Sequence, residues 1–176
     1  LNKTRSGLLS VLKSMGANIQ ILNQKIECNE DVADLLIKSS ALHGVEIGGA
    51  IIPNIIDEIP ILSIAASCAE GKTTIKDAKE LRVKESDRLE AIASGLKALN
   101  VPHYLHEDGI EISGVKEIFP SDEPIDSFGD HRIAMSFLIA GLKCSQPITV
   151  HDCENILTSF PNFLELTSSV GYKIEK

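Results

Sequence analysis

Residues 55–78 read IIDEIPILSIAASCAEGKTTIKDA, and residues 128–153 read FGDHRIAMSFLIAGLKCSQPITVHDC. Each stretch opens with a helix pattern that is apolar nearly all round, and each closes with a short strand, TTIKDA or ITVHDC. A helix without a polar face has to be enclosed on most of its sides. The two stretches therefore predict two helices in the interior of the protein, each followed by a strand.

A second kind of segment lies around these two. It has a one-faced helix pattern, ends at Gly or Asn and then runs into a strand. Gly16, Asn100 and Gly171 stand where a left-handed C-terminal cap belongs. We expect these helices to face the surface or to be half-buried. The three segments are TRSGLLSVLKSMGANIQIL (4–22), ESDRLEAIASGLKALNVPHYL (85–105) and TSFPNFLELTSSVGYKIEK (158–176).

The two kinds of segment form a repeat. Residues 34–40, 43–49 and 104–114 read as short strands with Gly and Asn turns between them. The order is buried helix, strand, exposed helix, strand, strand, and it recurs about every 73 to 75 residues. This order predicts one α/β domain over residues 1–176, with βαβαββ-like units, buried helices and outer sheets. The chain starts at an exposed helix, so we expect its first unit to be incomplete.

The composition narrows the range of partners. The formal net charge is −8, so we expect neither nucleic acid nor an anionic membrane surface as a partner. The longest apolar runs are about ten residues, too short to span a bilayer. The four cysteines show no C-x-x-C spacing and the histidines form no metal-binding pattern, so we expect no metal.

Ionisable residues stand at the start of both buried helices and of the middle exposed helix. If the units stack in register, these starts lie on one rim, where free N–H groups favour anions. Guanidinium groups would bind carboxylate or phosphate there, and carboxylates held among cations would serve proton transfer. The alternative is a set of surface ion pairs. The residues are Asp57, Glu58, Lys84, Glu85, Asp87, Arg88, Asp130, His131 and Arg132; Asp57 and Asp130 are also candidate helix caps.

Three stretches resemble motifs of one enzyme family. LRVKESDRL (81–89) is similar to the second signature of the 5-enolpyruvylshikimate-3-phosphate synthases, and GDHRIAM (129–135) and SFPNFLEL (159–166) resemble their C-terminal motifs. IIDEIPILSIAA places Asp57 where the family has an acidic residue before the signature Glu85. The resemblance runs from about residue 4 to the end but covers only the family's C-terminal domain. It implies the inside-out α/β barrel fold of the enolpyruvyl transferases.

The resemblance also implies catalytic roles. Asp57 would accept the proton of the 5-hydroxyl of shikimate 3-phosphate. Glu85 would serve the methylene carbon of phosphoenolpyruvate, first as acid and then as base. The reaction would transfer the enolpyruvyl group to that hydroxyl by addition and elimination, in the shikimate pathway to aromatic amino acids. It would need no metal or organic cofactor.

The remaining site residues follow from the same resemblance. Arg88 and Arg132 would bind phosphoenolpyruvate, Lys84 would reach the phosphate side of shikimate 3-phosphate, and His131 would orient its neighbours. Thr158 departs from the family pattern, since many members have Lys at this place. One cationic contact to the phosphate is therefore not expected here.

The resemblance implies a larger enzyme. The chain would supply half of an active site that closes against an N-terminal domain, so the isolated fragment would be inactive. We expect a cytoplasmic monomer. Two other functions are compatible with the residues: an enolpyruvyl transferase of the same fold that uses UDP-N-acetylglucosamine as acceptor, and a non-catalytic module that binds ligands.

Overall fold

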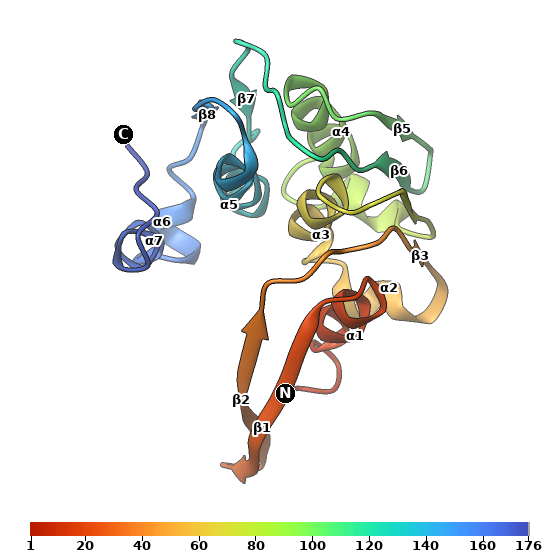
Figure 1. The fold of residues 1–176 in the computed structure, drawn as a ribbon, viewed down its shortest axis with the longest axis vertical. Helices are drawn as coiled ribbons and strands as arrows, with labels where there is room; N and C mark the ends of the chain where they lie inside the picture. The colour runs from red at the N-terminus through yellow and green to blue at the C-terminus, as the bar shows by residue number, and fades with distance from the viewer. Residues whose placement is uncertain (176) are drawn as a thin grey trace.

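The computed structural model describes residues 1–175, which form helices around one main hydrophobic core with strands outside it (Figure 1). The helices are α1 (Gly7–Ser14), α2 (Ile52–Ile55), α3 (Ile59–Ser67), α4 (Arg88–Ala98), α5 (His131–Ala140), α6 (Ile156–Ser159) and α7 (Phe163–Ser169). Three 3₁₀ turns are η1 (Gly49–Ile51), η2 (Lys79–Val83) and η3 (Gly141–Lys143).

The strands form three small sheets. β3, β4, β6 and β5 form a four-stranded sheet in that order, in which β3 and β4 are parallel and the other neighbours antiparallel. β1 and β2 form a long antiparallel hairpin that extends away from the other elements (Figure 1), and β7 and β8 pair in parallel. The strands are β1 (Asn18–Glu27), β2 (Glu30–Lys38), β3 (Glu46–Ile47), β4 (Lys72–Ile75), β5 (His103–Leu105), β6 (Ile110–Ser113), β7 (Ile125–Asp126) and β8 (Val150–His151).

Helices α3 and α5 lie inside, as their all-round apolar patterns predict. No residue of either helix is exposed, and the two helices pack against each other. Ile59, Leu62, Ile133 and Phe137 are at most 1% exposed and belong to the main core. The expectation of interior helices is therefore confirmed.

Helix α4 is buried on all but one face: Glu90, Ser94 and Lys97 are exposed, so the half-buried helix that the sequence predicts is confirmed. It lies among β5, β7, α3 and α5, and its small residues allow close packing. Gly95 shows this most clearly, because a Cβ atom there would lie 2.1 Å from the ring of Phe137. Its buried residues are Arg88, Leu89, Ala91, Ile92, Ala93, Gly95, Leu96 and Ala98.

The helix ends agree with the sequence in most places. Gly16, Asn100 and Gly171 have φ angles of +94°, +53° and +88°, so the left-handed caps are confirmed. The carboxylate of Asp130 accepts hydrogen bonds from two backbone N–H groups of α5, so it caps that helix. Asp57 does not cap α3, which starts after Glu58, because arginine side chains bind its carboxylate instead.

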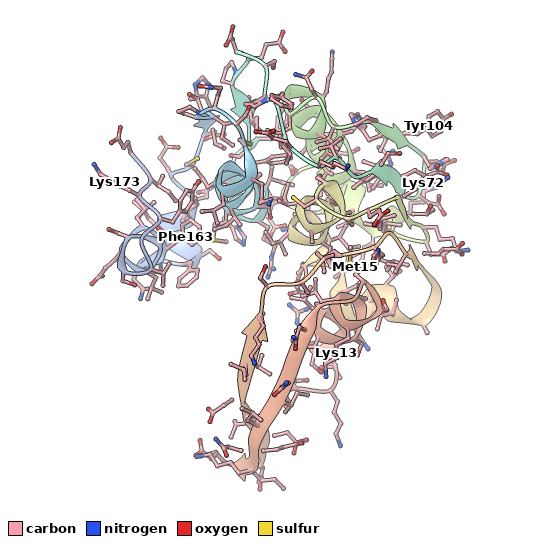
Figure 2. The ribbon with its side chains drawn as sticks, viewed as in Figure 1. Lys13, Met15, Lys72, Tyr104, Phe163 and Lys173 are labelled. Atoms are coloured by element: carbon pink, nitrogen blue, oxygen red, sulfur yellow. The ribbon has the colours of Figure 1, made fainter. Side chains whose placement is uncertain are left out.

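The strand predicted after Gly171 is absent from residues 172–175; Lys176 lies outside the described residues. A strand needs a hydrogen-bonded neighbour, and here side chains hold the segment instead. The hydroxyl of Tyr172 donates to the backbone oxygen of Leu138, and Ile174 packs on a second, smaller cluster. Figure 2 shows Phe163 of this cluster on the far side of the molecule from Tyr104, which lies on β5.

Within residues 1–175, no single helix is both long and apolar enough to cross a membrane. The segments Gly49–Ile55 and Ile59–Ser67 meet the length and composition criteria only as a pair, and they are bent by 108° at their junction.

Candidate active site

The starts of α4 and α5 and the turn before α3 meet at the guanidinium group of Arg88. Its Nε donates to Oδ2 of Asp130 at 2.7 Å, its Nη1 to Oδ1 of Asp57 at 3.1 Å, and its Nη2 to Oε2 of Glu85 at 2.6 Å. Three carboxylates from three parts of the chain therefore share one cation. The stacking that the repeat predicted brings Asp57, Glu85 and Arg88 together.

Asp57 is surrounded by three arginines. Besides Arg88, Nη2 of Arg5 donates to its Oδ2 at 2.8 Å, and Nη2 of Arg132 lies 3.7 Å from the same oxygen. Nη1 of Arg132 also donates to the backbone oxygen of Asp57 at 2.9 Å. Burial alone would raise the pKa of the Asp57 carboxyl, but the arginine hydrogen bonds and charges outweigh it and hold the pKa below its usual value. Asp57 is therefore an ionised carboxylate in a cationic setting.

Asp130 is the fully buried member of the cluster. Besides Arg88, it accepts from the hydroxyl of Ser86 at 3.1 Å and from backbone N–H groups of α5. Burial works to raise its pKa, yet the hydrogen bond and charge of Arg88 keep the pKa below its usual value. The sequence indicated Asp130 as a candidate cap and as one of the ionisable residues at the helix starts, but not as the partner of Arg88. Its pairing with Arg88 could have been suspected, because a buried arginine requires an acid.

A cavity of about 630 Å³ opens beside the cluster. Glu85, whose side chain is 51% exposed, and His131 at the start of α5 reach it, so the shared cation Arg88 lies just behind its wall. Of the three carboxylates that bind Arg88, Glu85 is the one that lines the cavity. The lining residues are Glu85, Phe128, Gly129, His131, Asn155, Thr158 and Ser159.

Arg132 and Arg88, both predicted to bind anions, differ in how accessible their side chains are. Arg132 is partly exposed and contacts Asp57, so it can still meet a ligand. Arg88 is 1% exposed and fully engaged by carboxylates, so an anion could reach it only after Glu85 moved away. In this structure Arg88 holds the acids in place.

Lys84 and His131 stay outside the ion-pair cluster. Nζ of Lys84 lies 2.7 Å from Oε1 of Glu80, four residues earlier, and within residues 1–175 it forms no ion pair with Asp57. His131 lines the cavity, but within residues 1–175 its ring makes no hydrogen bond, so the expected orienting contact is not formed here. Thr158, noted above for its departure from the motif that the sequence resembles, also lines the cavity.

The sequence reasoning missed Arg5. Its contact with Asp57 joins residues 52 positions apart, and nothing in the local pattern before α1 indicates it. Glu58 was noted at the helix start, and its Oε1 lies 3.6 Å from Nη1 of Arg132 and 4.0 Å from Nη2 of Arg5. Its other oxygen, Oε2, is buried and has no hydrogen-bond partner within the described part of the chain.

Comparison with known proteins places this geometry in one family. A family model described as EPSP synthase (3-phosphoshikimate 1-carboxyvinyltransferase) matches residues 1–166. The 3-phosphoshikimate 1-carboxyvinyltransferase of Petrotoga mobilis is 54% identical over 97% of this chain and 39% of its own length, and that of Geotalea uraniireducens is 50% identical with the same coverage. The chain thus spans about two-fifths of the length of these relatives.

Solved structures agree with the fold. An EPSP synthase from Acinetobacter baumannii superposes with a TM-score of 0.94 at 45% identity, covering 99% of this chain and 41% of that one. The enolpyruvyl transferase NikO from Streptomyces tendae, at 19% identity, has a TM-score of 0.70 over 97% of this chain and 36% of its own, and so supports the fold alone. The enolpyruvyl transferase fold is confirmed. The chain belongs to the EPSP synthase (3-phosphoshikimate 1-carboxyvinyltransferase) family.

Proposed function

We propose that this chain is the C-terminal domain of a 3-phosphoshikimate 1-carboxyvinyltransferase. The whole enzyme transfers the enolpyruvyl group of phosphoenolpyruvate to the 5-hydroxyl of shikimate 3-phosphate and releases phosphate. One observation carries the proposal: Asp57 and Glu85, the two acids expected to move protons, bind the same guanidinium group beside an open cavity.

The addition step needs a base and an acid at the same time. Asp57 takes the proton of the 5-hydroxyl while the hydroxyl oxygen bonds to C2 of phosphoenolpyruvate. Glu85 delivers a proton to C3, so that the methylene becomes a methyl group and a tetrahedral adduct forms. The two acids suit these tasks because Asp57 is held ionised among arginines, whereas Glu85 is exposed to the cavity.

The elimination step reverses one of these transfers. Glu85, now a carboxylate, removes a proton from the methyl group, the bond from C2 to the phosphate oxygen breaks, and phosphate leaves with the electron pair. Arg132 and Lys84 are proposed to bind the substrate anions, and both side chains are partly exposed. Arg88 is proposed to contact the anion only when Glu85 moves, and His131 to orient groups in the cavity.

The reaction also requires residues outside this chain. We propose that an N-terminal domain supplies the other half of the site, so the chain alone has no turnover. The length of the relatives supports this, since the chain covers 39% of each of the two described above. We further propose that the complete enzyme is a cytoplasmic monomer.

The first repeat unit is proposed to be completed by residues outside this chain. Within residues 1–175, β2 pairs only with β1, whereas β6 in the next unit pairs with both β5 and β4. An apolar cavity of about 370 Å³ also lies open between α1, α3 and α5. A further strand and buried helix, as in the later units, would cover both features.

The test is an assay of the chain completed by its N-terminal domain, with phosphate release as the readout. Both substrates together should give turnover, and Glu85→Gln should lower kcat at least about a hundredfold. Glu117→Gln, at an exposed position away from the cavity, is the matched control. Consumption of UDP-N-acetylglucosamine in place of shikimate 3-phosphate, or an unaffected Glu85→Gln, would contradict the proposal.

A further inference from the structure

Arg5 connects the segment before α1 to the turn before α3. Its Nη2 lies 2.8 Å from Oδ2 of Asp57 and 4.0 Å from Oε1 of Glu58. The side chain is half-exposed, and its hydrogen bond to Asp57 spans 52 positions of sequence. Arg5 differs from an arginine in an ordinary surface ion pair, because its partner Asp57 belongs to the candidate active site.

The two oxygens of Asp57 are held by different arginines. Arg88 binds Oδ1 at 3.1 Å, and Arg5 binds Oδ2 at 2.8 Å. Arg132 is 3.7 Å from Oδ2, and its hydrogen bond goes to the backbone oxygen of Asp57 instead. Arg5 is therefore the arginine that fixes the second oxygen, and with Arg88 it sets the plane of the carboxylate.

We propose that Arg5 is a positioning residue for the base Asp57: it fixes the orientation of the carboxylate toward the substrate hydroxyl and keeps it ionised. The inference rests on the proposed function, in which Asp57 accepts the hydroxyl proton. Arg5 acts through Asp57 and does not itself contact the reacting atoms.

The charges around Asp57 give the direction of its titration. Arg5, Arg88 and Arg132 face it as cations, while Glu58 lies next to it and Glu85 and Asp130 share Arg88 with it. Burial works to raise the pKa of Asp57, and the hydrogen bond from Arg5 is the largest of the effects that lower it. Removing the Arg5 guanidinium therefore raises the pKa of Asp57.

Asp57 can accept a proton only when its carboxyl group is ionised, so the pH dependence of kcat/KM reports a change in its pKa. With a higher Asp57 pKa, the rise of kcat/KM on the acid side moves to higher pH. A carboxylate that is free to rotate is also placed less well, which lowers kcat by about ten- to a hundredfold. KM should change by less than about threefold, because Arg5 does not bind substrate.

The experiment uses the complete enzyme with Arg5→Gln, Arg5→Lys and the control Lys3→Gln, which removes a neighbouring exposed charge. Kinetics are measured across pH, and the carboxyl pKa of Asp57 is followed by NMR of ¹³C-labelled aspartate, with Asp57→Asn assigning the signal. Arg5→Gln should raise that pKa, shift the acid limb to higher pH and lower kcat. Arg5→Lys should restore part of kcat, and Lys3→Gln should behave as the parent.

Three outcomes overturn the inference. One is an unchanged carboxyl pKa together with an unchanged acid limb in Arg5→Gln. Another is an equal loss of kcat in Lys3→Gln, which would indicate a general charge effect, and the third is a lower melting temperature with normal kinetics, which would indicate a purely structural role. An active Asp57→Asn enzyme would refute the proposed base itself, and the NMR titration separates this failure from the others.

Discussion

Arg88 and Asp130 form a buried ion pair, with Nε and Oδ2 2.7 Å apart and side-chain exposures of 1% and 0%. The pair joins the first residue of α4 to the residue that caps α5, so the two helix starts cannot separate without exposing or isolating a charge. This constraint holds Asp57 and Glu85 together, since both bind the same guanidinium.

Breaking the pair should destabilise the fold strongly. Asp130→Ala leaves Arg88 without its fully buried partner and also removes the cap of α5, so we expect the free energy of unfolding to fall by about 3–5 kcal/mol. Urea denaturation followed by circular dichroism measures this. Asp122→Ala, at an exposed aspartate before β7 whose carboxylate makes no hydrogen bond within residues 1–175, is the control and should change stability little. Equal losses in the two variants would contradict a special role for the buried pair.

Stability should depend on pH through the same cluster. The pKa values of Asp57 and Asp130 are both lowered in the folded chain, so the unfolded chain binds more protons in the range between the folded and unfolded values. Their stabilising effect is complete above the ordinary aspartate pKa of about 3.9 and is lost as the pH falls toward the lowered values. Urea midpoints measured from pH 7 downward should show this decline. Asp130→Asn should flatten it; an identical slope in the variant would refute the prediction.

The burial of α4 predicts a steric effect at Gly95. A methyl group there would lie 2.1 Å from the buried ring of Phe137, so Gly95→Ala should destabilise the chain by about 1–3 kcal/mol although alanine favours helix. Ser94→Ala, at an exposed position of the same helix, should be neutral or slightly stabilising. Thermal unfolding compares the two. A stabilised Gly95→Ala would mean that α4 and α5 are not packed this closely.

The sequence predicted the parts of the fold that follow from how apolar residues are distributed around each helix. α3 and α5 are apolar all round, so their burial follows from the pattern itself. The motif residues Asp57, Glu85 and Arg88 converge because the repeated units stack with their helix starts together. The one-faced pattern of α4 predicted its half-buried position but not how closely Gly95 packs against Phe137 of α5. Of the acids that bind the buried Arg88, only Glu85 is local among the described residues; Asp57 and Asp130 come from distant parts of the chain, and a local pattern does not contain them.

The local sequence pattern could not predict the contact of Arg5 with Asp57. For the same reason it could not predict the absence of a strand after Gly171. Each depends on a partner that is remote in sequence: Arg5 meets a turn 52 positions later, and a strand forms only beside another strand. Residues 172–175 are held by side-chain contacts instead, through the hydroxyl of Tyr172 and the packing of Ile174. Local propensity does not determine such contacts.

Thr158 offers a test of anion binding in the cavity. It lines the same cavity as Glu85 and His131, so Thr158→Lys would add a cation to that wall. In the complete enzyme, and on the proposed function, we expect the KM for phosphoenolpyruvate to fall about two- to fivefold, since one added ion pair at an exposed site contributes up to about 1 kcal/mol. Leu157→Lys is the control, because Leu157 is 52% exposed and does not line the cavity. The gain should weaken as salt rises and be absent from the control. An equal gain in both variants would indicate attraction by net charge, and no gain in Thr158→Lys would mean that the phosphoenolpyruvate anion does not approach this wall.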